Sequence, residues 1–177
     1  MKKINSPSFA VPLVFILGTL FSAATFAQDS HSVAPDFNLP SDQGELSLSS
    51  YKGKVVYLDF WASWCQPCKL SFPWMNEMQE KYQDQGLAVL TINLDANIKD
   101  AQKFLAANHA VFKVAFDTQG TMPEQYGLKG MPTSYLIDPE GNIVLQHMGF
   151  HAKDKALLEK KLQQLLSQQV SSLELTQ

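Results

Sequence analysis

The sequence predicts a three-layer α/β/α sandwich built on a mixed central sheet. Two continuous apolar runs, residues 55–60 and 87–94, have the composition of strands covered on both faces, and a segment of helical periodicity follows each. Late in the chain, residues 135–137 and 143–148 flank a turn-forming stretch and predict two antiparallel strands, and an amphipathic helix follows them. Strands that alternate with helices and end in a hairpin and a helix indicate this fold class.

The first 27 residues have the features of an export signal. Lys2 and Lys3 precede an apolar stretch over residues 10–21, and the small-residue run SAATFAQ then offers a cleavage point after Ala27. Residues 9–27 carry no charge and approach the ~20 residues that span a bilayer, so an uncleaved membrane anchor is the alternative. Residues 28–177 are then expected to form a single domain.

The first half of that domain is expected to contain a hairpin, a strand and a helix. Residues 28–54 mix short apolar pieces with Pro, Gly, Ser and Asp, which predicts an extended lead-in and a hairpin around Asp42-Gln43-Gly44 that pairs with the edge of the sheet. The strand at residues 55–60 follows, and its single charge is Asp59. Over residues 67–82 apolar side chains recur at helical spacing, Gly86 closes the pattern, and Pro73 should kink the helix.

The second half continues the alternation. After the strand at residues 87–94, either Asp95 or Asn97 caps a helix that runs to Asn108. Residues 112–117 predict a short strand, and residues 122–126 predict a short helix that ends at Gly127. The last helix spans residues 152–170 with its leucines on one face, and the tail SSLELTQ is expected to fray.

Composition excludes some partners. The chain has 177 residues, 45% of them hydrophobic, which suffices for one domain with a substantial core. Residues 28–177 keep 12 of the 14 lysines and all 17 acids, a net charge near −5, and the sequence contains no arginine. Without arginine or a long basic run, nucleic-acid binding has almost no support.

Both cysteines, Cys65 and Cys68, lie in the segment WCQPC. A structural staple is a weak explanation, because closing so small a loop constrains the unfolded chain little. A structural zinc site needs four Cys or His ligands, and the four histidines are scattered along the sequence. A two-thiolate copper(I) site stays open because thiolates suit that ion. The remaining alternative is a redox-active pair.

The redox hypothesis accounts for each feature of the segment. A cysteine at the start of a helix faces unpaired backbone N–H groups and the positive end of the helix dipole, which stabilise the thiolate. Cys65 is then the nucleophile, and Cys68, one turn later, resolves the mixed disulfide. Asp59 lies six residues before Cys65 and, if buried, would exchange a proton with Cys68; the alternative is a strand-end aspartate bound by backbone N–H groups.

Three more side chains lie near the cysteines in the sequence, and two of them, Trp64 and Lys69, have a second explanation. Trp61 and Trp64 fit as core aromatics, but Trp64, directly before Cys65, can also shield the site and contact a substrate. Lys69 is either a solvated helix residue or a charge that modestly favours the thiolate.

These residues resemble a known family. The segment WCQPC after an apolar strand, with GMPT late in the chain, is similar to the thioredoxin superfamily, and APDFNL with YKGKVVYLDFWASWC narrows the resemblance to exported TlpA/ResA-like thiol-disulfide oxidoreductases. The resemblance covers residues 34–164. It implies a thioredoxin fold with an N-terminal β-hairpin and a strand-helix insertion within residues 95–126. It also implies a cis peptide bond before Pro132, in a loop that faces the cysteines, with Met131 as a substrate contact.

Two departures from the family matter. Many exported relatives have a glutamate three residues after the second cysteine, where this chain has Ser71. Thioredoxins usually pair the acid at the position of Asp59 with a lysine on the next strand, where this chain has Thr91. Asp59 is therefore expected to have a pKa raised by burial, with less relief from a nearby positive charge.

The expected function is that of a periplasmic thiol-disulfide oxidoreductase that reduces disulfides of exported proteins, with apocytochrome c as one candidate substrate. The electron donor implied by the resemblance is a membrane thiol transporter, and the protein contacts a membrane itself only if its N-terminal segment is uncleaved. The Cys65–Cys68 disulfide needs no metal and no further cofactor. The alternatives are a copper(I) carrier, a structural module that has kept the fold, and a peroxidase, which would need a cysteine motif of different spacing.

Overall fold

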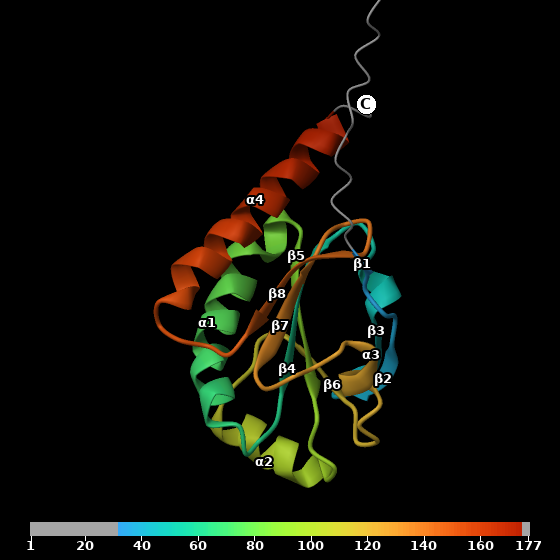
Figure 1. Ribbon diagram of the computed structural model, residues 1–177, viewed down its shortest axis with the longest axis vertical. Helices are drawn as coiled ribbons and strands as arrows, with labels where there is room; N and C mark the ends of the chain where they lie inside the picture. The colour runs from blue at the N-terminus through green and yellow to red at the C-terminus, as the bar shows by residue number, and fades with distance from the viewer. Residues whose placement is uncertain (1–31, 175–177) are drawn as a thin grey trace, which may run out of the picture.

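The computed structural model describes residues 32–174. Its helices are η1 (Leu48–Tyr51), α1 (Gln66–Tyr82), η2 (Gln83–Gln85), α2 (Ile98–Ala107), α3 (Met122–Gln125) and α4 (Asp154–Glu174). Its strands are β1 (Ser32–Val33), β2 (Asn38–Ser41), β3 (Gly44–Ser47), β4 (Val55–Trp61), β5 (Leu87–Asn93), β6 (Lys113–Phe116), β7 (Thr133–Ile137) and β8 (Asn142–Met148). The helices flank one sheet (Figure 1), so the predicted layered α/β architecture is confirmed.

All eight strands form one mixed sheet in the order β1-β8-β7-β4-β5-β6-β2-β3. The three strands β4, β5 and β6 run parallel, and β7 and β8 complete one side in antiparallel pairing. The predicted N-terminal hairpin is β2 and β3, and β2 pairs with the edge strand β6 as expected. The central strand β4, which leads to the cysteines, therefore lies between β7 and β5.

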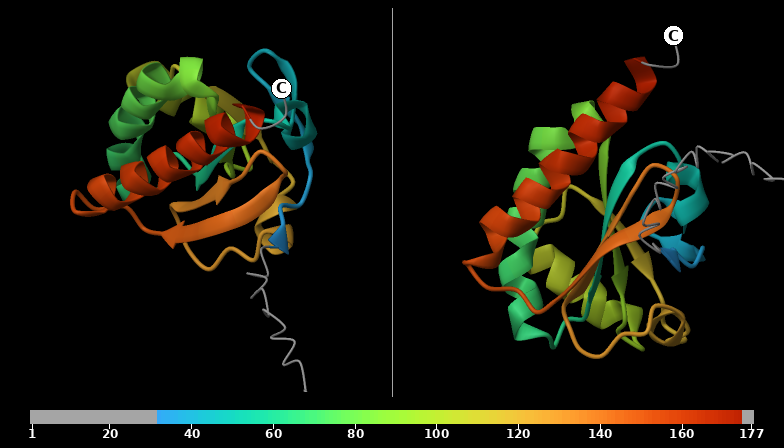
Figure 2. Two further views of the ribbon diagram at one scale, coloured as in Figure 1. Left: turned by 90° about the horizontal axis from the view of Figure 1, so that it is seen from above. Right: turned by 45° about the horizontal axis from the view of Figure 1, so that its top comes forward.

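Residues of β4 alternate between two apolar cores, which explains its continuous apolar sequence. Tyr57 and Trp61 belong to the core beneath α1 and α4, whereas Leu58 and Phe60 belong to the core beneath α3 and the N-terminal hairpin. Figure 2 shows α1 and α4 together on one face of the sheet, while the short α3 lies on the other. The helical layer opposite α1 is thus thin.

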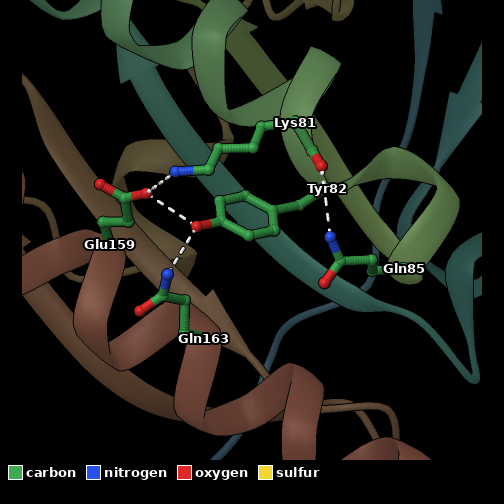
Figure 3. Close-up of polar contacts among 5 residues, drawn as sticks. All are labelled: Lys81, Tyr82, Gln85, Glu159 and Gln163. Atoms are coloured by element: carbon green, nitrogen blue, oxygen red, sulfur yellow. Dashed lines mark hydrogen bonds and ion pairs between the residues drawn. The ribbon is translucent and has the colours of Figure 1, made fainter.

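A polar network joins α1 to α4 (Figure 3). Glu159 on α4 accepts hydrogen bonds from Lys81 Nζ and from the Tyr82 hydroxyl, each at 2.7 Å. Gln163 donates to the same hydroxyl oxygen at 2.7 Å. The C-terminal helix is therefore attached to the end of the helix whose start carries the cysteines.

The structure decides between the two predicted caps of α2 and corrects the predicted end of α4. The cap is Asn97, whose side chain accepts from Lys99 N at 3.1 Å, whereas Asp95 has other partners. Helix α4 continues to Glu174, so the first four residues of the tail that was expected to fray are helical. The predicted export segment, residues 1–27, lies outside the described residues, and within residues 32–174 no helix is long and apolar enough to cross a bilayer.

Candidate active site

Cys65 and Cys68 form a disulfide at the start of α1. Strand β4 ends at Trp61, three residues follow, and Cys65 occupies the N-cap of the helix with extended backbone angles. Its backbone N donates to Ala62 O at 3.0 Å, and its Sγ accepts from Cys68 N at 3.3 Å. The first sulfur is therefore at the position where the unpaired N–H groups of a helix favour an anion.

The two sulfurs differ in accessibility. Cys65 is 5% exposed and Cys68 is 0% exposed. A partner that approaches from solvent can therefore reach Cys65, whereas Cys68 is fully buried. This asymmetry fits the predicted division between a nucleophile and a resolving cysteine.

Asp59 is enclosed within the sheet. It is 1% exposed and faces Thr91 on β5 and Ser134 on β7, and its Oδ2 has no hydrogen-bond partner among the described residues. Burial raises the pKa of Asp59 well above its usual value, in the predicted direction. The neighbour Thr91 is neutral and gives Asp59 no positive charge. Its hydroxyl accepts from Trp61 Nε1 at 3.2 Å and donates to Lys113 O at 3.3 Å.

The loop before β7 has the predicted backbone. The Met131–Pro132 peptide bond is cis. Pro132 O accepts from Gly149 N at 2.7 Å, and Thr133 Oγ1 donates to Gly130 O at 2.7 Å. Met131 packs against the large core cluster to which both cysteines belong.

The remaining predicted residues occupy different environments. Trp61 is buried in the core, whereas Trp64 is 67% exposed and lies open to solvent directly before Cys65. Lys69 is exposed on α1. Ser71, at the position where many relatives have glutamate, is buried and donates to Cys68 O at 2.9 Å, so it supports the backbone of the second cysteine.

One functional contact was missed by sequence reasoning. Asp95, after β5, accepts hydrogen bonds from Ser63 N and Ser63 Oγ, both at 2.9 Å, and from Asn93 Nδ2 at 2.8 Å. The carboxylate thereby holds the segment that leads from β4 to Cys65. The two residues are 32 positions apart, and Asp95 looked like a helix cap, so no local pattern indicated the contact.

Among residues 32–174, no group of three His, Cys, Asp or Glu side chains is arranged to hold a metal ion. The chemistry that the described site supports is exchange between the Cys65–Cys68 disulfide and the thiols or disulfides of a partner.

Comparison with known proteins agrees with this chemistry. Residues 31–146 match the model of the AhpC/TSA family. The chain is 33% identical over 174 residues to the thiol-disulfide oxidoreductase ResA of Bacillus cereus, which covers 93% of this chain and 99% of the relative. It is 34% identical over 137 residues to ResA of Bacillus subtilis, covering 75% of this chain and 76% of that one.

A solved structure from Chlorobium tepidum, described as a candidate thiol:disulfide interchange protein DsbE, superimposes with a TM-score of 0.77. It shares 55% sequence identity, and the alignment covers 78% of this chain and 98% of that one. The predicted thioredoxin fold is thus confirmed. The chain belongs to the AhpC/TSA family and to the ResA-like thiol-disulfide oxidoreductases.

Proposed function

We propose that the enzyme acts after export, in the periplasm, and reduces disulfides in exported proteins through a mixed disulfide at Cys65. The observation that carries this proposal is the position of Cys65: its sulfur is at the N-terminus of α1, accepts the Cys68 N–H, and is the more exposed of the pair. Export is supported by the sequence of residues 1–27.

The exchange proceeds in two steps. The Cys65 thiolate attacks one sulfur of the partner's disulfide, and the other partner sulfur leaves with the electron pair. Cys68 then gives up its proton and attacks the Cys65 sulfur, which closes the Cys65–Cys68 disulfide and releases the second partner thiolate. The partner is reduced by two electrons and the enzyme is oxidised by two.

Asp59 is the proposed proton acceptor for Cys68. Its carboxyl group is buried on the strand that leads to the cysteines, and burial raises its pKa well above its usual value. Met131 and Pro132, whose loop shares a core with the cysteines, and the exposed Trp64 are the proposed substrate contacts. Lys69 supplies a nearby positive charge that favours the thiolate.

The reducing direction rests on resemblance and on the proline of WCQPC, which reducing thioredoxins share. A disulfide of apocytochrome c is one proposed target, and a membrane thiol transporter is the proposed electron donor. The cycle needs no cofactor besides the Cys65–Cys68 disulfide.

The first test is the reduction potential of the Cys65/Cys68 pair, measured on residues 28–177 by tryptophan fluorescence in graded thiol-disulfide buffers. We expect a value near that of thioredoxin, roughly −270 mV. A value near −120 mV, where strong oxidants lie, would reverse the direction and make the protein a disulfide donor. Cys68→Ser should trap the mixed disulfide with substrate, whereas Cys65→Ser should form none.

A further inference from the structure

A row of polar side chains crosses the sheet through Asp59. Thr91, Asp59, Ser134 and His147 are consecutive cross-strand partners on β5, β4, β7 and β8. Side chains of directly opposite residues project from the same face of a sheet, and neighbouring Cα atoms in such a row are about 4.5–5.5 Å apart. On β4, Asp59 lies on the same face as Tyr57 and Trp61, which belong to the core beneath α1 and α4. The row therefore lies on the face that α1 and α4 cover.

Exposure increases along this row from Asp59 toward β8. Asp59 is 1% exposed and Ser134 is 4% exposed, whereas the His147 side chain is 21% exposed. His147 Nε2 lies 3.4 Å from Asp154 Oδ2, at the start of α4. Strand β1 pairs only with Asn142 and Ile143, so at His147 strand β8 is the edge of the described sheet. His147 Nε2 is itself buried with no hydrogen-bond partner among the described residues, so the row leads from the buried acid to an imidazole that is only partly exposed.

The proposed chemistry requires such a path. In the mixed disulfide the partner is bonded to Cys65, the only cysteine with any exposure, and Cys68 and Asp59 lie beneath it. A proton that Asp59 has accepted must leave before the acid can accept another, and a docked partner closes the entrance at Cys65. On the β5 side, the Thr91 hydroxyl is already engaged by Trp61 and the Lys113 carbonyl. The β7 and β8 side offers a hydroxyl and an imidazole.

We propose that Ser134 and His147 relay the proton of Asp59 to solvent. The inference rests on the proposed role of Asp59 in thiol-disulfide exchange. When Cys68 attacks Cys65, its thiol proton passes to the Asp59 carboxylate, and the bond from Cys65 to the partner breaks with the electron pair leaving on the partner sulfur. The proton then passes by way of the Ser134 hydroxyl, which both accepts and donates, to the His147 imidazole and on to water. Recharging of the enzyme uses the same path inward.

The groups around the row are consistent with this assignment. Tyr57 lies two residues before Asp59 on β4. Burial raises the pKa of Tyr57 well above its usual value, and the charge of Asp59 raises it further. The Ser134 side chain, beside the Tyr57 hydroxyl, lowers the pKa and opposes both effects. Tyr57 therefore stays protonated and does not compete for the proton. At the start of α4, Asp154 lies beside His147, and His147 and His151 are the titratable groups that act on this carboxylate.

The test compares His147→Ala and Ser134→Ala with the unchanged protein in single-turnover stopped-flow, with a peptide disulfide as substrate and a pH indicator that reports the proton released to solvent. We expect both variants to slow release of this proton about tenfold, less than the roughly 10²-fold or larger effect of removing a proton-transfer group itself. Imidazole buffer should restore the rate of His147→Ala, because a small base can replace the missing side chain. Reduction potential and thermal unfolding should stay unchanged, since a relay alters rates and not equilibria.

Two variants serve as matched controls. His151→Ala removes an exposed histidine outside the row, and Ser134→Thr keeps the hydroxyl, so both should react at the unchanged rate. A His147→Ala protein that is as fast as the unchanged protein, while Asp59→Asn is slow, would overturn the relay and leave the role of Asp59 intact. A slow His147→Ala that imidazole does not restore would also overturn it. An Asp59→Asn protein of full rate would instead refute the proton step of the proposed function.

Discussion

The proposed role of Asp59 links the chemistry of the cysteines to the stability of the fold. A carboxyl group that is 1% exposed, with a neutral threonine and a neutral serine as its cross-strand neighbours, has little to stabilise its charge. The same environment keeps the group protonated to higher pH, which a proton acceptor for a thiol requires. The residue is therefore expected to lower stability and raise activity.

Asp59→Asn tests both halves of that statement. Below the unfolded pKa of 3.8 both states bind the proton, and burial of the neutral acid has no electrostatic cost. As pH rises from there to the raised folded pKa, the unfolded chain ionises first, so the free energy of unfolding falls by about 1.4 kcal/mol per pH unit. The asparagine variant lacks this slope. It should be the more stable protein at pH 7 and roughly 10²-fold slower in exchange.

Urea unfolding of both proteins between pH 3 and 8, with NMR titration of the Asp59 carboxyl carbon, measures this difference. Parallel stability curves for the two proteins, or titration of Asp59 at or below its ordinary value, would show that burial does not control this acid. Asp36→Asn is a suitable control, since that carboxylate is exposed and accepts from Ser49 N at 3.0 Å.

At the scale of elements, the polar network between α1 and α4 fixes the position of the helix that carries the cysteines (Figure 3). The hydrogen bond from Lys81 lowers the pKa of Glu159 most, followed by the one from Tyr82, and the same contact with Glu159 raises the pKa of Lys81 to about 12. Because Glu159 is only partly buried, solvent screens its ion pair with Lys81. The charge of Glu159 therefore contributes at most about 1 kcal/mol to the free energy of unfolding.

Glu159→Gln should therefore lower the free energy of unfolding by about 1 kcal/mol or less at pH 7. A depressed folded pKa stabilises the protein above the unfolded value of 4.5 and loses that contribution as pH falls through the folded pKa. The difference between the two proteins should thus be constant above pH 5 and disappear at lower pH. Equal differences at pH 3 and pH 7 would mean that packing, not charge, is responsible; Glu80→Gln, an exposed α1 residue, should change little.

At the scale of the whole molecule, the sequence predicted the elements well because their signals are local. Strands buried on both faces have continuous apolar runs, as in β4 and β5, and the terminal leucines follow the 3.6-residue period. The thioredoxin fold and the cis bond at Pro132 came from resemblance to a family. Contacts between distant residues could not be predicted: Asp95 with Ser63, and the alignment of Ser134 and His147 with Asp59, depend on sheet register, which no short pattern encodes.

The last prediction concerns the extent of the folding unit. The described sheet begins at Ser32, and both cores are built from residues 34–166. Residues 28–177 should therefore unfold in one cooperative transition, with the same Cys65/Cys68 reduction potential as the full chain in detergent, because this segment contains all of residues 34–166. Calorimetry and redox titration of the two forms measure this. A fragment that unfolds in two transitions, or whose potential differs by more than about 30 mV, a tenfold change in equilibrium constant, would show that the N-terminal segment is part of the folded enzyme and not only an address for export.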